Sequence, residues 1–437
     1  MTVKVTVTPS ALSGEIVAPS SKSEAHRLLI CSALADGVTD LDCSTSSADV
    51  DATANCLRAL GASVARTRLG FRVKGLPRSN DGSLQAQSDA ELDCGESGST
   101  LRFLLPVVAA LGCNARMTGH GRLPNRPLSP LYEELVAHGS ELSAQGQMPL
   151  RVGGKLHAGT FELPGNVSSQ YASGLLFAAP VLREAVEILI SCPVESKPYI
   201  DLTIASLARF GCVVDEKPTD DRHALRLFVC APNGLVSPGT VRVGGDWSGA
   251  AFWLAAGAIA GDGIRVRGLD PTSAQGDMAM LSCLSLMGAH VRRNSDGASS
   301  SSGLLCGRTI DMSNCPDLVP PLAAVAAVAT GTTQITGAAR LRLKESDRLS
   351  TVSAAIVALG GSAEATDDGL IISGREELEG GEVDAANDHR IAMMAAILAP
   401  RCRRPVTIWG ADCVAKSYPA FFEDLQALGG ICTKEGE

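Results

Sequence analysis

Aromatic side chains are scarce in this sequence: Phe, Trp and Tyr make up only 4% of its 437 residues, although hydrophobic residues make up 45%. The interior must therefore be built mainly from Ala, Val, Leu and Ile, which suits closely packed helices and strands. A chain of this length is too long for one small core, so we expect roughly two or three domains.

Several functional classes lack their usual signatures. The 14 Cys residues form no CxxC pair and no Cys/His spacing of a zinc site, so we expect reduced, mostly buried thiols, no metal and a cytoplasmic protein. No secretory signal pattern opens the sequence, and apolar runs such as the one from Ala250 are shorter than the ~20 residues of a membrane span. The formal charge of -9 argues against a general nucleic-acid or anionic-membrane surface. Neither GxxxxGK[ST] nor GxGxxG occurs, so we expect no nucleotide cofactor bound by these loops.

Six glycines recur at nearly constant spacing and indicate an internal repeat. Each follows an amphipathic segment and precedes a β-prone one, as in RALGASV and ARFGCVV. The glycines are Gly61, Gly139, Gly211, Gly288, Gly360 and Gly429, separated by 78, 72, 77, 72 and 69 residues. Because glycine is the usual left-handed cap after a helix, we expect six copies of one unit, each ending as helix, turn and strand.

A second, more apolar segment begins at a polar cluster in each copy, and we expect it to be a helix buried on all sides. These segments begin SSKSEAHRLL, ESGSTLRF, SSQYASGLL, GDWSGAAFW, PDLVPPLA and NDHRIAM. Six units divide into two sets of three, which predicts two similar α/β domains with buried helices inside and sheets outside. Breaks at Pro19 and at PNGLVSPGT place the first domain at 20–240 and the second at 1–19 with 241–437.

Two stretches lie outside this scheme. MTVKVTVTPS alternates like a half-buried strand but precedes the first buried helix, so we expect it to pair with the last three units. The serine-rich run NSDGASSSSG, from Asn294, is interpreted as a solvent-exposed connecting loop.

The starts of buried helices are candidate anion sites, because their first N–H groups lack helical partners and the helix dipole adds positive character. Basic residues strengthen three of these starts: Lys22 and Arg27 in the first, Arg102 in the second, His389 and Arg390 in the sixth. Ser168, Ser169 and Gln170 offer neutral donors in the third. If both domains turn these starts inward, the cleft between them would bind a ligand with several phosphate or carboxylate groups.

Two other stretches place charged residues close together. In LKESDRL, Lys344 and Arg348 are one helical turn apart with Glu345 between them, a cluster able to hold an anion and to move a proton. The alternative is an ordinary salt-bridged helix start on the surface. In GRLPNRP, Arg122 and Arg126 lie in a Gly/Pro-bounded loop, where the guanidinium fork suits a carboxylate or a phosphate.

Nine motifs, in this order along the chain, resemble those of the 5-enolpyruvylshikimate-3-phosphate synthase family. They are SKSEAHR, ESGSTLR, GRLPNRP, NVSSQYASGLL, SKPYIDLT, PDLVPPLA, LKESDRL, NDHRIAM and AKSYPAFF. The resemblance implies an inside-out α/β barrel fold: two domains of three βαβαββ repeats each, joined by two crossovers. It also implies transfer of the enolpyruvyl group of phosphoenolpyruvate to the 5-hydroxyl of shikimate 3-phosphate, in the shikimate pathway to chorismate and aromatic amino acids. We expect a monomer that binds these two small molecules, without a cofactor, nucleic acid or membrane.

Carried over position by position, the resemblance implies two sets of ligand contacts. The shikimate 3-phosphate set is Lys22, Ser23, Arg27, Ser168, Ser169, Gln170, Ser196, Tyr199, Asp317 and Lys344. The phosphoenolpyruvate set is Lys22, Gly98, Arg122, Gln170, Glu345, Arg348, His389, Arg390 and Lys416. In this family glyphosate occupies the phosphoenolpyruvate site, so an added methyl at Gly98 is expected to project toward it. Arg340 stands where some members carry an Asn that contacts the shikimate ring.

The implied reaction needs groups that move protons. The 5-hydroxyl loses a proton as it attacks C2 of phosphoenolpyruvate while C3 gains one, and the tetrahedral ketal then loses a C3 proton and expels phosphate. We assign Asp317 to the hydroxyl, Glu345 to the C3 proton and Lys22 to acid catalysis or to the phosphate; these roles could be exchanged among the three.

Three alternative functions remain. UDP-N-acetylglucosamine enolpyruvyl transferases share the fold and reaction type, but most members use a reactive loop Cys that GHGRLPNRP lacks. RNA 3'-terminal phosphate cyclases are more distant, and the acidic net charge disfavours an RNA partner. A non-catalytic repeat scaffold would not need so many basic residues at helix starts.

Overall fold

The chain divides into two compact units in the computed structural model, which describes residues 3–219 and 225–436. The first unit is Lys22–Val243, and the second unit is Met1–Ser21 together with Gly244–Glu437. These boundaries fall slightly later in the chain than the breaks expected near residues 19 and 240. The reason is that β16 (Thr240–Arg242) pairs in parallel with β4 (Val38–Asp42), so the chain as far as Val243 belongs to the first unit.

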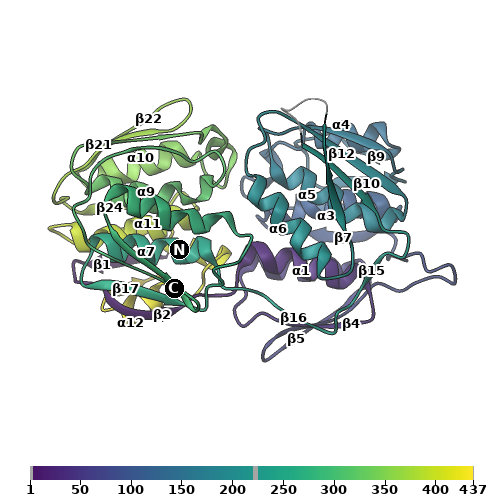
Figure 1. Cartoon of the computed structure of the whole chain (residues 1–437), viewed down its shortest axis with the longest axis horizontal. Coiled ribbons are helices and arrows are strands. Elements are labelled where there is room, and N and C mark those ends of the chain that lie inside the picture. Colours follow the sequence, from purple (N-terminus) through teal and green to yellow (C-terminus); the bar gives the residue numbers. More distant parts are fainter. Residues whose placement is uncertain (1–2, 220–224, 437) are drawn as a thin grey trace. The chain divides into compact units, whose positions relative to one another are not determined.

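Each unit has an interior of three helices, as the apolar segments predict. The buried helices are α1 (Lys22–Leu34), α3 (Gly98–Leu111) and α5 (Ser169–Leu182) in the first unit, and α7 (Trp247–Ile259), α9 (Val319–Ala327) and α11 (His389–Leu398) in the second. Their side chains are buried around nearly the whole helix, and within each unit the strands lie around these helices (Figure 1). Sheets outside and buried helices inside are the reverse of the usual α/β arrangement.

The other helices end at the six repeating glycines. They are α2 (Ala48–Ala59), α4 (Leu131–Ala137), α6 (Lys197–Ala208), α8 (Met280–Met287), α10 (Arg348–Ala358) and α12 (Phe421–Ala427). Each repeating glycine has a positive φ, from +80° at Gly211 to +108° at Gly61. The predicted left-handed caps are therefore confirmed.

Six four-stranded sheets are present in the described part of the chain, three in each unit. In the first unit their spatial orders are β16-β4-β6 (Gly70–Lys74)-β5 (Ser63–Thr67), β7 (Ala90–Asp93)-β8 (Ala115–Thr118)-β10 (Leu150–Gly154)-β9 (Ser140–Leu142), and β11 (Thr160–Pro164)-β12 (Ala185–Ser191)-β14 (Leu225–Cys230)-β13 (Val214–Lys217). A short parallel ribbon joins β3 (Ala35–Asp36) to β15 (Leu235–Val236).

In the second unit the orders are β2 (Ser13–Val17)-β17 (Gly263–Arg267)-β19 (Gly297–Ser301)-β18 (His290–Asn294), β20 (Thr309–Asp311)-β21 (Thr332–Thr336)-β23 (Leu370–Ser373)-β22 (Ser362–Ala365), and β24 (Gly381–Asp384)-β25 (Val406–Trp409)-β1 (Lys4–Thr8)-β26 (Ile431–Glu435). In all six sheets the first pair is parallel and the other two pairs are antiparallel. In four sheets the parallel pair encloses a buried helix along the chain: α3, α5, α9 or α11. In the other two, the buried helix α1 or α7 precedes the second strand, and the first strand comes from a distant part of the chain. The βαβαββ repeat is therefore confirmed.

The N-terminal strand completes the last repeat. β1 pairs antiparallel with both β25 and β26, matching Val5 with Ile408 and with Lys434. The expectation that this strand joins the last three units is confirmed.

The interpretation of NSDGASSSSG as a solvent loop is wrong, because this run contains the end of β18, the turn after it and the whole of β19, which pairs with β18. Ala298 and Ser300 alternate toward the core and are buried, and the Ser300 hydroxyl donates to the Leu254 carbonyl at 2.5 Å. A serine that finds such an acceptor can occupy an interior strand position. The run of serines therefore hid a period-two pattern.

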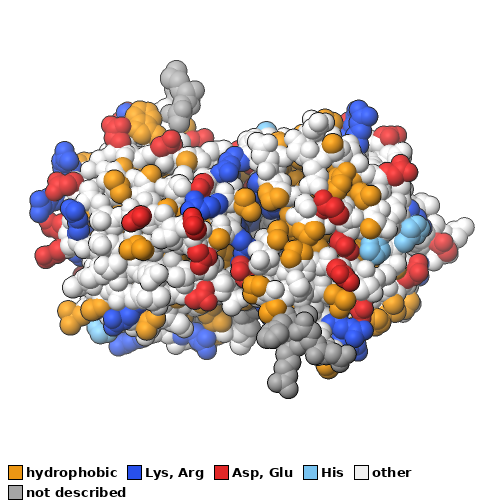
Figure 2. All heavy atoms as spheres, turned by 90° about the horizontal axis from the view of Figure 1, so that it is seen from above, with side chains coloured by type: hydrophobic (Ala, Val, Ile, Leu, Met, Phe, Trp, Pro, Cys, Tyr) orange, Lys and Arg blue, Asp and Glu red, His pale blue; other side chains and the backbone are white. Residues whose placement is uncertain are grey.

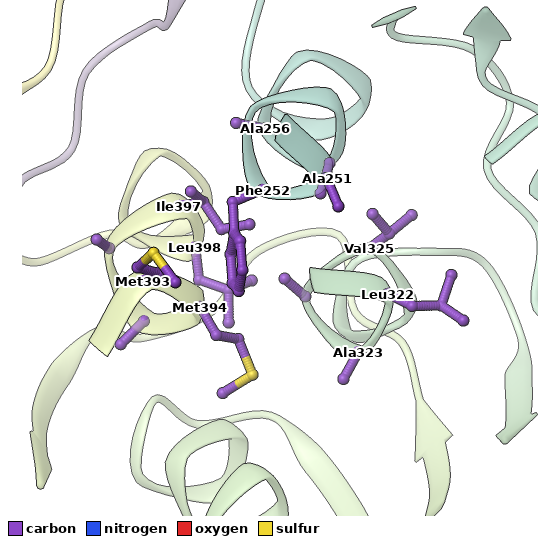
Figure 3. Close-up of a cluster of buried hydrophobic side chains, with 14 of the residues drawn as sticks. Ala251, Phe252, Ala256, Leu322, Ala323, Val325, Met393, Met394, Ile397 and Leu398 are labelled. Carbon is purple, nitrogen blue, oxygen red and sulfur yellow. The ribbon is translucent and has the colours of Figure 1, made fainter. Parts of the chain in front are cut away.

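The second unit's core shows why few aromatic residues suffice. Helices α7, α9 and α11 contact one another, and Ala251 and Ala256 let α7 approach its neighbours closely (Figure 3). Phe252 extends from α7 toward Ile397 and Leu398 of α11. Small residues thus bring the helix backbones together, and single large side chains fill the remaining space.

Short 3-10 helices precede or follow several of the helices. They are η1 (Leu123–Asn125), η2 (Gly276–Ala279), η3 (Pro316–Leu318), η4 (Ala339–Leu343), η5 (Ala399–Arg401) and η6 (Ala411–Lys416). Two of them, η3 and η5, adjoin the buried helices α9 and α11. Lys344 directly follows η4 and has an extended backbone conformation. Helix α10 begins only at Arg348, and Asp347 caps it. Lys344 and Arg348 are therefore not one helical turn apart on the same helix, because the cap separates them.

The surface carries both signs of charge, and the face in Figure 2 shows acidic and basic side chains interspersed. All 14 Cys side chains are free, and most of them are buried. Across the described residues, no helix combines the length and the apolarity needed to cross a membrane.

Candidate active site

Asp317 lies at the centre of a charged cluster in the second unit. It stands in η3, directly before α9, and its Oδ1 accepts from Arg348 Nη1 at 3.0 Å and lies 3.4 Å from Lys344 Nζ. Its Oδ2 accepts from Arg390 Nη2 at 3.3 Å, and Arg390 Nη1 donates to its backbone carbonyl at 2.9 Å. Three basic side chains from separate segments therefore converge on one carboxylate.

These cations control the ionisation of Asp317. Burial alone would raise its pKa, but the charges of Arg390, Lys344 and Arg348 outweigh burial and the opposing charge of Glu345, and hold the pKa well below the ordinary value. Asp317 is consequently a carboxylate at neutral pH. It can accept hydrogen bonds from every side.

Arg348 is buried and joins three carboxylates. Its Nε donates to Asp388 Oδ2 at 2.9 Å, and its Nη2 donates to Asp388 Oδ1 at 3.2 Å and to Glu345 Oε2 at 2.5 Å. With the bond to Asp317, four of its five N–H groups are engaged by described residues. The carboxylates outweigh burial and raise the pKa of Arg348. The alternative of a salt-bridged surface helix start is wrong for this residue, whose side chain is 1% exposed.

The start of α11 contributes two residues to this group of charged side chains. We call the group the Asp317 cluster: Asp317, Lys344, Glu345, Arg348, Asp388 and Arg390. Asp388 caps α11 by accepting from Arg390 N at 3.0 Å. Arg390 Nη2 also donates to Ser248 Oγ at 2.7 Å, in the first turn of α7. The starts of α7, α9 and α11 therefore meet at Arg390.

His389 and Lys416 both lie near the start of α11, but their side chains differ in exposure. His389 is the first residue of α11 and is 1% exposed. Lys416, at the end of η6, is half-buried, and its Nζ donates to the carbonyl of Asn387 at 2.7 Å. Of the two, Lys416 has the more accessible side chain.

In the first unit, Lys22 begins α1 and pairs with an acidic residue that the sequence did not single out. Its Nζ lies 2.9 Å from Asp49 Oδ2, in the first turn of α2, and the two side chains are 16% and 12% exposed. Nothing in the local sequence marks Asp49, because an acidic residue in the first turn of a helix is ordinary.

Arg27 is almost fully buried and is held by oxygens that carry no formal charge. Its Nε donates to Thr203 Oγ1 at 2.8 Å, Nη1 to Ser23 O at 2.7 Å and Nη2 to Tyr199 O at 2.9 Å. Its guanidinium also lies over the Phe103 ring, 4.9 Å from the centroid. Among described partners this leaves one N–H on each Nη.

Burial lowers the pKa of Arg27 to about 10, against smaller opposing contributions led by Tyr199. A guanidinium remains protonated at neutral pH even so. A buried positive charge whose hydrogen bonds go to neutral acceptors favours an incoming anion.

The starts of α3 and α5 are joined by a hydrogen-bond network. Arg102 Nη1 donates to Gln170 Oε1 at 2.8 Å, and Gln170 Nε2 donates to Ser99 Oγ at 3.0 Å. Ser168 caps α5 by accepting from Gln170 N at 3.3 Å, and Ser169 is the first residue of the helix. Ser168, Ser169 and Gln170 are half-buried.

Ser196 and Tyr199 bound the start of α6. Ser196 is buried in the left-handed region with φ +56°, immediately before the helix. The Tyr199 carbonyl is the acceptor for Arg27, so α1 and α6 are fixed to each other at this point. The α6 start thus lies beside the Arg27 guanidinium.

Gly98 makes room for an arginine. A Cβ added at Gly98 would lie 2.6 Å from Arg126 Nη1 and 2.7 Å from Arg126 Cζ. Arg126 is buried against the α3 start, whereas Arg122 is exposed at the beginning of η1. The sequence placed both in one loop, but only the fold shows that Arg126 is the one beside Gly98.

The structure therefore assembles the sequence-predicted residues in two groups, one in each unit. The second unit brings Asp317, Lys344, Glu345, Arg348 and Arg390 together, with Lys416 beside the α11 start. Four residues outside the two ligand sets are bonded to or packed against a member of those sets: Asp49, Arg102, Arg126 and Asp388. The sequence had indicated Arg102 and Arg126 as anion-binding cations, but it had not indicated Asp49 or Asp388. Arg340 donates to Ser313 O at 2.7 Å. Among the described residues no group of three or more His, Cys, Asp or Glu side chains is placed to hold a metal ion.

Fold and site together define an α/β protein of six repeats in which basic side chains gather at the starts of several buried helices. The family model of EPSP synthase (3-phosphoshikimate 1-carboxyvinyltransferase) matches residues 7–425. The 3-phosphoshikimate 1-carboxyvinyltransferase of Clostridium kluyveri is 40% identical over 427 residues, 98% of this chain and 97% of that protein. Its counterpart in Clostridium perfringens is 40% identical over 434 residues, 99% of this chain and 100% of that protein.

Solved structures agree. The EPSP synthase of Acinetobacter baumannii superposes with a TM-score of 0.80 at 27% identity, covering 99% of this chain and 100% of that one. The enolpyruvyl transferase NikO of Streptomyces tendae shares the fold, with a TM-score of 0.76 at 18% identity, covering 99% of each chain. This chain belongs to the EPSP synthase family.

Proposed function

We propose that this protein transfers the enolpyruvyl group of phosphoenolpyruvate to the 5-hydroxyl of shikimate 3-phosphate and releases phosphate. The class of reaction follows from membership of the EPSP synthase family and from the name 3-phosphoshikimate 1-carboxyvinyltransferase that its relatives carry. The observation that carries the assignment to this site is the Asp317 carboxylate, held among three cations at the start of a buried helix.

Shikimate 3-phosphate needs one site for a carboxylate and another for a phosphate. We assign Arg27 and Ser23 to the carboxylate, because the two remaining Nη–H groups of Arg27 suit an anion with two oxygens. Ser168, Ser169 and Ser196 are assigned to the phosphate, because the starts of α5 and α6 supply backbone N–H groups as well as hydroxyls. Gln170, Tyr199, Lys22, Lys344 and Asp317 complete this set.

Phosphoenolpyruvate carries both a carboxylate and a phosphate and needs more positive charge. Lys22, Arg348, Arg390 and Lys416 supply it in this proposal, together with Arg122, Gly98, Gln170, Glu345 and His389. We add Arg126, because its guanidinium lies directly over Gly98. An anion reaching Arg348 competes with Asp317 for the guanidinium, since four of its N–H groups are already engaged.

This competition gives Asp317 a mechanism for activation. In the unliganded protein its pKa is held low by Arg390, Lys344 and Arg348. Substrate anions bound to the same cations would neutralise part of that charge and raise the proton affinity of the carboxylate. Asp317 would then accept the proton of the 5-hydroxyl only when both substrates are present.

Glu345 and Lys22 are assigned to the remaining steps. Glu345 is fixed by Arg348 and stands three residues before it, so a proton held there lies beside the cations proposed for phosphoenolpyruvate. It would deliver a proton to C3 and remove one from C3 of the ketal. Lys22, paired with Asp49, would act as an acid or would hold the departing phosphate.

Phosphate release tests the proposal. The purified protein is expected to release phosphate only when phosphoenolpyruvate and shikimate 3-phosphate are both present. Release with UDP-N-acetylglucosamine as the acceptor would instead support the alternative enolpyruvyl transferase. Absence of release with either acceptor would contradict both.

A further inference from the structure

Tyr171 is tied to the loop that carries Arg126. It is the third residue of α5, and its hydroxyl donates to the carbonyl of Pro127 at 2.7 Å. The ring is 1% exposed. Burial raises the pKa of Tyr171, so the hydroxyl remains a donor at neutral pH.

The loop runs from Gly119 to Pro127 between β8 and α4, and it is anchored at several points. At its beginning His120 N donates to Gly95 O at 2.9 Å, and in its middle Leu123 is buried. At its end the Pro127 carbonyl accepts twice, from Tyr171 and from Arg102 Nη2 at 2.9 Å. At the end of the loop, one carbonyl oxygen therefore accepts hydrogen bonds from both α3 and α5.

That oxygen belongs to the residue after Arg126. One peptide bond separates Pro127 from the arginine whose guanidinium lies over Gly98, so the bond from Tyr171 constrains where the Arg126 side chain begins. Arg102 holds the same carbonyl, but its other arm binds Gln170. The Tyr171 side chain also interacts with Arg102, whose guanidinium lies over the ring, 5.7 Å from the centroid, so both groups hold the Pro127 carbonyl from the same side chain cluster.

We propose that Tyr171 is a positioning residue: its hydroxyl fixes the Gly119–Pro127 loop so that Arg126 stays over the α3 start, and this sets the affinity for phosphoenolpyruvate. The inference rests on the proposed function for its ligand. It requires no contact between Tyr171 and either substrate. It differs from a general contribution to folding because only one of the two substrates is affected.

Tyr171→Phe removes the hydroxyl and leaves the ring, and Pro127 keeps its bond from Arg102. Tyr132→Phe is the matched control, because the Tyr132 hydroxyl also donates to a backbone carbonyl in the first unit, that of Leu142 at 3.2 Å. Both variants lose a tyrosine hydroxyl that donates to a backbone carbonyl. We expect Tyr171→Phe to raise KM for phosphoenolpyruvate about two- to tenfold, with kcat and KM for shikimate 3-phosphate unchanged. Tyr132→Phe should change neither KM.

Amide hydrogen exchange gives a readout that does not depend on activity. Exchange at His120–Arg126 should be faster in Tyr171→Phe than in the wild type and in Tyr132→Phe. Unchanged exchange with an unchanged KM for phosphoenolpyruvate would overturn the inference, as would an equal rise in both KM values. A wild-type protein that releases no phosphate would defeat the proposed function alone, because the exchange comparison still tests the loop.

Discussion

At the scale of single residues, the buried charges are compensated differently in the two units. Arg348 is matched by three carboxylates, whereas Arg27 is held by two backbone carbonyls and a threonine hydroxyl. The sequence predicted both arginines, because each lies in a recognisable motif. It could not distinguish Arg126 from Arg122, since only the folded loop buries one and exposes the other.

Asp317→Asn tests the proposed base. The substitution keeps size and hydrogen-bonding shape but removes the charge and most of the proton affinity, so we expect kcat to fall at least about 100-fold. Binding of shikimate 3-phosphate, measured by calorimetry, should change much less. Asp311→Asn is the control, because Asp311 is an exposed carboxylate that only caps a turn at Ser313. Near-normal turnover in Asp317→Asn would show that another group takes the hydroxyl proton.

His26 gives stability a dependence on pH. Its ring is buried, with Nδ1 2.7 Å from Thr53 Oγ1, and burial, with help from Lys22 and Arg27, holds its pKa well below 6.5. The folded protein therefore keeps this ring neutral, while the unfolded chain binds a proton below about pH 6.5. The stabilisation is complete above that pH and is lost as the pH falls, at up to about 1.4 kcal/mol per pH unit.

Urea unfolding between about pH 7.5 and pH 5.5 measures this loss. His26→Asn, which keeps an acceptor near Thr53, should show a smaller fall in unfolding free energy than the wild type. The exposed His290→Asn should retain the wild-type slope. If His26→Asn also retained it, the dependence would come from other groups.

At the scale of elements, the hydrophobic periodicity and the glycine spacing were sufficient to predict most of the helices. All six buried helices and all six glycine caps are where the sequence predicts them. The errors arose where a polar residue occupies a buried position or where a cap begins a helix late. The serine run was interpreted as a loop because a buried serine is unusual, but the Ser300 hydroxyl donates to the Leu254 carbonyl inside a strand. Asp347 is the N-cap of α10, so this helix begins at Arg348 and not before Lys344.

Gly211 isolates the contribution of the glycine cap. Its φ is +80°, and an added Cβ would meet no atom within 4 Å, so Gly211→Ala would cost only backbone strain, about 1–2 kcal/mol of unfolding free energy. Gly211→Asn should cost less, because asparagine tolerates the left-handed region. Urea denaturation of the three proteins provides the comparison. Equal stability of Gly211 and Ala, or a larger cost for Asn than for Ala, would contradict the role given to the cap.

At the scale of the whole molecule, the order of strands in the chain differs from their order in the repeats. β1 completes the last repeat and β16 begins the first one, so the chain leaves the second unit after Ser21 and returns at Gly244. The repeat count was predictable from the glycine spacing, and the place of β1 from its alternating hydrophobicity and its position before the first buried helix. The place of β16 was not, because three residues carry too little pattern. A monomeric state, a cytoplasmic location and a substrate cleft between two domains stay predictions.

The central claim is that this protein transfers the enolpyruvyl group of phosphoenolpyruvate to the 5-oxygen of shikimate 3-phosphate. Phosphorus NMR of the purified protein with phosphoenolpyruvate and shikimate 3-phosphate tests it most directly, with proton NMR to identify the enol ether at the 5-oxygen. The account predicts that both substrates disappear together and that the enolpyruvyl product and inorganic phosphate appear in equal amounts. Phosphate accompanied by pyruvate, with shikimate 3-phosphate unchanged, would contradict it.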